Sequence, residues 1–229
     1  MNKIFTTLII TTLLAGCKVD LTTKINTDDL LSTEHKSVAG LIRVEVPSCN
    51  DFEDSRKDSN SLTDLKMKIP TVFRGAEFKE CYKQKLSSYA DFVIPIGVGY
   101  MDGDFKPVDT DIYIFSTNDV YAGVILNKDA AARIKSAKKG LPDDMKLELT
   151  LIIEKGQKPI PNIAALGVYM TGLETNNSPI ISRRVVIEGK EVKFKLSDVS
   201  NSELSEGKAI PVLVKVDYIK KLVGNLEMP

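Results

Sequence analysis

The stretch 145-MKLELTLIIE-154 indicates how this chain folds, because its apolar and polar residues alternate. Leu147, Leu149 and Leu151 fall on one face of an extended strand, and the residues between them fall on the other. The stretch 38-VAGLIRVEVP-47 alternates in the same way. Both stretches therefore predict strands that bury one face against a core.

The same alternation of apolar and polar residues predicts a chain made mostly of strands with few helices. Further strands are expected over 18–25 (a short edge strand), 89–98, 111–116, 120–126, 163–170, 184–187, 192–196 and 210–219. Short helices are expected over 62–69, which Pro70 should end, and over 128–139, where Asn127 supplies the N-cap. This pattern predicts an α+β fold, mainly antiparallel sheet with two or three short helices.

The chain divides at a turn-rich stretch, 99-GYMDGDFKPVD-109. We expect residues 1–16 to form a signal peptide, residues 17–100 an N-terminal α+β half and residues 108–219 a C-terminal α+β half. One continuous domain spanning both halves is the alternative.

The first 17 residues, MNKIFTTLIITTLLAGC, are typical of a secretory signal. Lys3 precedes an uncharged run that is too short for the ~20 apolar residues of a transmembrane helix. A cleaved signal fits better, and Leu14-Ala15-Gly16-Cys17 resembles the lipobox of bacterial lipoproteins. The resemblance implies that the Cys17 thiol carries a diacylglyceryl group and that the mature chain holds two or three acyl chains such as palmitate. Several buried chains make a stable anchor.

Export predicts both the membrane to which the lipoprotein is sorted and the redox state of its two other cysteines. Lys18 stands where an Asp would retain a lipoprotein in the inner membrane, so we expect lipid attachment to the outer membrane, facing the periplasm. Cys49 and Cys81 then meet an oxidising compartment, where a disulfide between them is the expectation and two separate buried thiols the alternative. Such a bridge would contribute about 3–4 kcal/mol through chain entropy.

Composition excludes some functions. The 31 basic and 31 acidic residues balance, which leaves no electrostatic footprint for nucleic acid. His35 is the one histidine, and the cysteines lack the close spacing of zinc sites, so we expect no metal and no cofactor. The densest carboxylate group, a weak calcium candidate without the EF-hand order, comprises Asp102, Asp104, Asp109 and Asp111.

No catalytic residue is expected, so we interpret the protein as a non-enzyme. A nucleophilic triad needs a histidine base, and His35 lies in a polar segment that predicts an exposed loop. The sequence from Ser136 to Lys139 has the bare S-x-x-K spacing without the S-D-N and K-T-G elements. Gly97-Val98-Gly99 lacks the third glycine of a dinucleotide-binding loop.

The mature start, 17-CKVDLTTKINTDDLL-31, together with 44-VEVPSCNDFEDSRK-57 and 78-FKECYKQKLSSYADFVIPI-96, resembles uncharacterised lipoproteins encoded by tailed phages and prophages of enteric bacteria. The resemblance implies an envelope protein, and some phage lipoproteins block outer-membrane receptors against superinfection. The leading hypothesis is therefore a membrane-anchored binding module for another envelope protein. A host envelope structural or assembly factor and a hydrolase with an atypical site are the alternatives.

Overall fold

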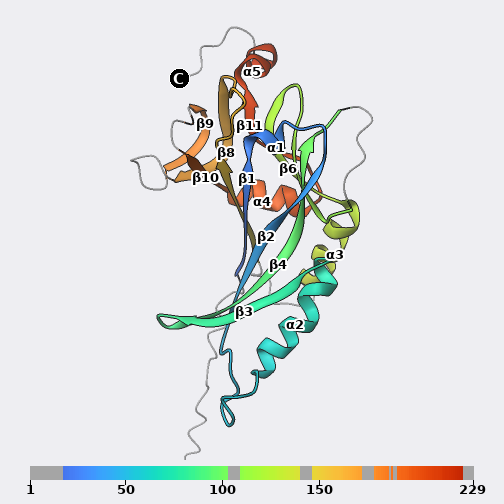
Figure 1. Cartoon of the computed structure of the whole chain (residues 1–229), viewed down its shortest axis with the longest axis vertical. Coiled ribbons are helices and arrows are strands. Elements are labelled where there is room, and N and C mark those ends of the chain that lie inside the picture. The colour runs from blue at the N-terminus through green and yellow to red at the C-terminus, as the bar shows by residue number, and fades with distance from the viewer. Residues whose placement is uncertain are drawn as a thin grey trace, which may run out of the picture.

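The computed structural model describes residues 18–102, 109–139, 146–171, 178–185, 187 and 190–223, and their central feature is a closed barrel of nine strands (Figure 1). The strands are β1 (Lys18–Asn26), β2 (Lys36–Val46), β3 (Glu77–Gln84), β4 (Ser87–Tyr100), β5 (Ile112–Ser116), β6 (Val120–Leu126), β7 (Lys146–Glu154), β8 (Ile163–Thr171), β9 (Ser178–Val185), β10 (Glu191–Leu196) and β11 (Ile210–Lys215). The helices are α1 (Thr27–Leu30), α2 (Asn60–Val72), α3 (Lys128–Lys139), α4 (Asp198–Ser205) and α5 (Val216–Val223).

The barrel closes because β8 pairs with β10 as well as with β11. Around the barrel the order is β10-β7-β1-β2-β4-β5-β6-β11-β8. Neighbours are antiparallel except at β1–β7 and β4–β5, which run parallel. These two parallel pairings join strands from residues 17–100 to strands from residues 108–219, so both segments contribute to one wall.

Alternating side chains fill the barrel interior. On β7, Leu149, Leu151 and Ile153 are at most 1% exposed, and Phe92 and Ile94 of β4 are equally buried. Period-2 alternation places every second residue on the same face, so each strand contributes its apolar set to one common core. The barrel is therefore a packed body.

Short helices pack against the barrel. Helix α4 packs against β6, β7, β8, β10 and β11, and its Asn201 amide bridges the Leu149 N–H and the Leu196 carbonyl. Helix α1 is joined to β5 where the Ser116 hydroxyl donates to the Leu30 carbonyl at 2.6 Å. Helix α2 lies beneath the long β3–β4 hairpin, at the other end of the molecule from α5 (Figure 1).

The expected α+β fold with two or three short helices is wrong. The structure is a closed barrel, with five short helices among its described residues. Alternation reveals which face of a strand is buried, but it does not reveal which distant strand completes the sheet. The expected edge strand at 18–25 is likewise wrong, because β1 lies between β2 and β7.

Two smaller predictions also differ from the structure. Pro70 does not end α2, which continues to Val72. Its missing N–H leaves a single helical bond unmade, and the Phe73 N–H still donates to the Ile69 carbonyl. The strand expected over 210–219 ends at Lys215, where α5 begins with its apolar residues at helical spacing.

In the described part of the chain, none of the helices combines the length and the apolar content that crossing a membrane requires.

Candidate functional site

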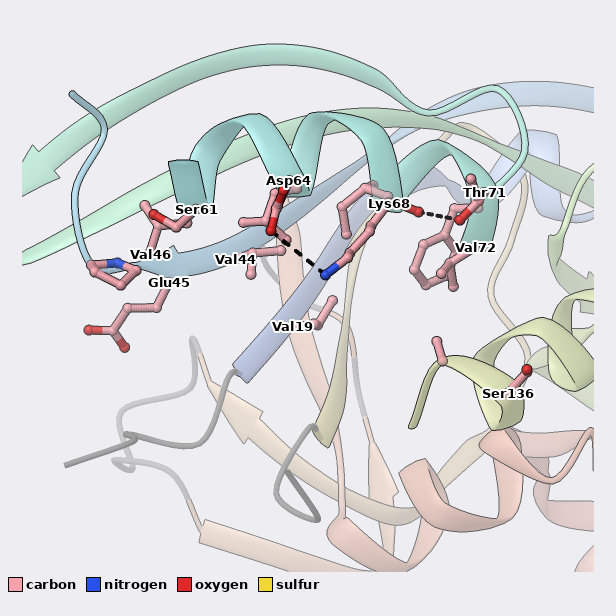
Figure 2. Close-up of a pocket in the computed structure, with 15 residues that line it drawn as sticks. Val19, Val44, Glu45, Val46, Ser61, Asp64, Lys68, Thr71, Val72 and Ser136 are labelled. Atoms are coloured by element: carbon pink, nitrogen blue, oxygen red, sulfur yellow. Dashed lines mark hydrogen bonds and ion pairs between the residues drawn. The ribbon is translucent and has the colours of Figure 1, made fainter. Parts of the chain in front are cut away.

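An apolar feature, which we call the end groove, is a cavity of about 450 Å³ between α2, the C-terminal part of α3 and the ends of β1 and β2 (Figure 2). Its walls include Val19, Val44, Val46, Leu65, Val72 and Phe73. Polar side chains stand at its rim, where Lys68 and Asp64 form a 4.0 Å ion pair. Apolar walls with a few polar rim groups are typical of ligand sites.

Helix α2, which forms one wall of the end groove, is fixed at its start. The N-cap Ser59 accepts a hydrogen bond from the Leu62 N–H and donates to the Ser48 carbonyl. In the loop between β2 and α2, Cys49 is joined to Cys81 of β3 by a disulfide, with their Cα atoms 5.6 Å apart. The expected disulfide is therefore present, and it fastens α2 to the hairpin above it.

The end of α2 is fixed by the carboxylate of Asp111, which is 2% exposed. It accepts hydrogen bonds from the Arg74 N–H at 2.6 Å and the Arg74 Nε at 2.9 Å, and it pairs with the Arg133 guanidinium at 2.6 Å. Burial by itself raises the pKa of this carboxyl, but hydrogen bonds from Arg133 and Arg74 outweigh it, so the pKa lies below its ordinary value. Arg133 also donates to the Val72 carbonyl, which joins α3 to α2.

A second feature, which we call the tyrosine–arginine cluster, lies on the outer face of the barrel where β2, β4 and β3 adjoin. Arg43 packs over the rings of Tyr82 and Tyr89, 5.4 and 5.8 Å from their centroids. A bidentate pair with the buried Asp91, at 2.9 and 3.0 Å, holds the guanidinium in place. Burial raises the pKa of the Tyr82 hydroxyl, and the hydrogen bonds that Arg43 donates to Asp91 raise the pKa of Arg43, so the arginine is charged and the Tyr82 phenol is neutral at physiological pH.

The carboxylates named as a calcium candidate are partly engaged by arginines. Asp111 is paired with two of them, and Asp109 lies 3.2 Å from the Arg74 guanidinium. Asp102 is exposed, and Asp104 lies outside the described residues. Within the described ranges, no three His, Cys, Asp or Glu side chains gather as a metal site would require. Asp111 joins the end of α2 to α3 through these two arginines, whereas Asp109 makes an exposed ion pair with Arg74.

The other residues singled out in the sequence are scattered. Cys17 and the segment 1–16 lie outside the described residues. His35 is half-buried: its Nε2 lies 3.1 Å from the Tyr100 carbonyl, and its ring meets the edge of Tyr113. Ser136 lies on the rim of the end groove, far along the chain from His35.

Sequence reasoning missed both the end groove and the tyrosine–arginine cluster. The groove needs the packing of α2 against strand ends, which no local pattern reveals. The cluster did carry a signal, because a tight turn between Gln84 and Ser87 places Tyr82 directly opposite Tyr89. Tyrosines at equal distances from a hairpin turn form a cross-strand pair.

Fold and surface together define a disulfide-stabilised barrel with an apolar groove at one end and an aromatic–arginine cluster on its outer face. The chain belongs to the family described as "Domain of unknown function (DUF7424)", whose model matches residues 19–218. No match was found among curated proteins.

Proposed function

We propose that the protein is a bacterial lipoprotein, anchored through Cys17, whose barrel is a non-enzymatic binding module for another envelope protein. The more specific form is a phage-encoded modulator of an outer-membrane receptor. The observation that carries the binding proposal is the tyrosine–arginine cluster. Tyr and Arg dominate the residues that supply most of the energy of protein interfaces.

The cluster is suited to binding because its arginine is already ordered. Asp91 is 2% exposed and grips Arg43 through two hydrogen bonds, and the rings of Tyr82 and Tyr89 confine it further. A side chain held in position before association loses little rotamer entropy when a partner arrives. The Arg43 side chain is 36% exposed, so part of it remains available to a partner.

The barrel would lie close to the membrane. Strand β1 begins at Lys18, the residue that follows the proposed lipid-bearing Cys17. One residue spans at most about 3.6 Å, so an anchor at Cys17 leaves almost no tether. A barrel without a tether reaches only partners at the same membrane, which supports an envelope protein as the partner. The phage origin rests on the sequence resemblance alone.

The test is phage adsorption to cells that express the full chain. The proposal expects reduced adsorption of at least one phage in a panel, and restored adsorption when Tyr82 and Tyr89 are both changed to Ala. Tyr169→Ala is the matched control, since Tyr169 is a half-buried strand tyrosine outside the cluster. Truncating residues that dominate an interface costs about 2 kcal/mol or more, a loss of roughly thirtyfold in affinity.

Two outcomes argue against parts of this proposal. Unchanged adsorption across the panel contradicts the receptor version. Capture of a secretion or barrel-assembly component by the wild-type chain, lost in the Tyr82→Ala/Tyr89→Ala variant, would instead favour a host assembly factor that uses the same surface.

A further inference from the structure

We infer that the end groove holds one acyl chain of the lipid carried on Cys17. This inference rests on the proposed lipid anchor and assigns a ligand class, a saturated hydrocarbon chain, to a cavity that the protein-binding proposal does not use.

The chemistry of the end groove matches a hydrocarbon chain. Val44 and Val46 of β2 and Leu65 and Val72 of α2 line the space, and Figure 2 shows Val44 and Val46 beneath α2. The cavity volume of about 450 Å³ lies within the roughly 300–1,000 Å³ of small-molecule sites. Among its polar lining side chains, Lys68 and Asp64 form an ion pair and are 65% and 60% exposed. An apolar chain would fill the floor without leaving a buried polar group unpaired.

The position of the end groove close to Cys17 in the sequence identifies the source of the acyl chain. Val19 belongs to the wall of the end groove, and Cys17 precedes it by two residues. Two residues span at most about 7 Å, so a lipid on the Cys17 sulfur begins beside the cavity. A ligand attached by a short covalent link has an effective concentration that free lipid does not match. The chain's own lipid is therefore the favoured occupant over a neighbouring phospholipid.

Occupancy would depend on the surroundings. The groove and a bilayer interior are both apolar, so moving one chain between them changes little apolar exposure to water. Away from a bilayer, the groove would shelter a chain that otherwise meets water. The remaining one or two chains would keep the protein at a membrane.

The experiment incorporates a photoreactive fatty acid into the lipid of the full chain in growing cells, followed by irradiation and mass spectrometry of the cross-linked peptides. We expect the label on Cys17 and cross-links to α2 and to the end of β2. Absence of label on Cys17 would refute the lipid anchor itself. A labelled Cys17 with cross-links to lipid only, or to peptides away from the groove, would overturn this inference and leave the anchor standing.

Two variants on one helix sharpen the result. Leu65→Lys puts a charge into the wall of the groove and should lower the groove cross-link about tenfold, because a buried charge without a partner is strongly disfavoured. Met67→Lys adds the same charge at a residue of α2 that is 61% exposed and should leave the cross-link unchanged. Equal cross-linking in the two variants would overturn the assignment. The wild-type cross-link position remains decisive if Leu65→Lys fails to fold.

A final arm separates the chain's own lipid from foreign lipid. Free photoreactive fatty acid added to the Cys17→Ser chain should cross-link within the end groove. The lipidated chain should resist this labelling, because its groove is occupied. Equal labelling of both proteins would assign the groove to foreign lipid and refute the proposed occupant.

Discussion

Removing the Asp111 carboxylate should destabilise the protein strongly. The carboxylate is 2% exposed and is the common acceptor for the Arg74 N–H, the Arg74 guanidinium and the Arg133 guanidinium. Breaking a buried ion pair by removing one partner costs about 3–5 kcal/mol, because the remaining charge stays buried and unpaired. The two arginine side chains are 47% and 26% exposed, so water replaces part of the loss.

We therefore expect Asp111→Ala to lower the free energy of unfolding by about 3 kcal/mol, the low end of that range. Asp111→Asn keeps an acceptor for the Arg74 N–H and should cost less, about 1–2 kcal/mol. Urea unfolding of residues 18–229, followed by far-UV circular dichroism, measures both changes. Asp109→Asn is the control, because Asp109 pairs with the same Arg74 but is 89% exposed, and it should change stability by less than about 0.5 kcal/mol.

The reasoning would be refuted if Asp111→Ala lost less than about 1 kcal/mol, or no more than Asp109→Asn. Either result would mean that solvent, and not Asp111, satisfies the two arginines at the end of α2.

The remaining predictions use the same unfolding measurement or a mobility assay. The folded-state pKa of Asp111 is lowered, so its contribution to stability is complete above the unfolded pKa of about 3.9 and is lost as the pH falls through the folded pKa. The free energies of unfolding of wild type and Asp111→Asn should therefore converge in acid and not in alkali. The joint change of Cys49 and Cys81 to Ser should cost about 3–4 kcal/mol, because the bridge closes a loop with a sequence separation of 32; unaltered urea midpoints would contradict this. Gly123→Ala should cost about 1–3 kcal/mol, since a Cβ there would lie 2.4 Å from the Phe115 ring, and a neutral effect would show that the ring can move. Cys17→Ser should abolish fatty-acid labelling of the full chain, and persistent labelling would contradict the proposed anchor.

Local patterns predicted individual elements well. The alternation in 145–154 corresponds to β7 at Lys146–Glu154, and 128–139 corresponds to α3. Asn127 does act as a helix cap, accepting from the Ala130 N–H. Each of these elements is specified by residues only a few positions apart, so the sequence pattern is enough to find it.

Local sequence patterns do not predict that the sheet closes into a barrel. The parallel β1–β7 ladder joins Val19 to Leu147, and a short alternating strand such as β1 would fit several neighbours equally well. Helices α4 and α5 were not predicted from the sequence, for a related reason. Both are eight residues long, and α4 is held by the Asn201 amide bridging two strands, a tertiary contact that local helix signals do not reveal.

The same limit applied to the functional surfaces. The end groove exists because Val19, Val44 and Leu65 come together from three elements. Part of the tyrosine–arginine cluster could be predicted from the sequence, because hairpin register alone pairs Tyr82 with Tyr89. Its arginine comes from β2, however, and joins the cluster only after β2 pairs with β4.

The place of β1 in the wall has a consequence for how the chain folds. The first described strand pairs with β2, which follows it after α1 and a short loop, but its other neighbour, β7, lies more than a hundred residues further along. One edge of β1 therefore stays open until β7 has been synthesised and has paired with it. Such long-range pairing slows folding and exposes a strand edge that can join a wrong partner. We expect the barrel wall to close late, and a chaperone that shields β1 to matter more for yield than for the stability of the folded protein.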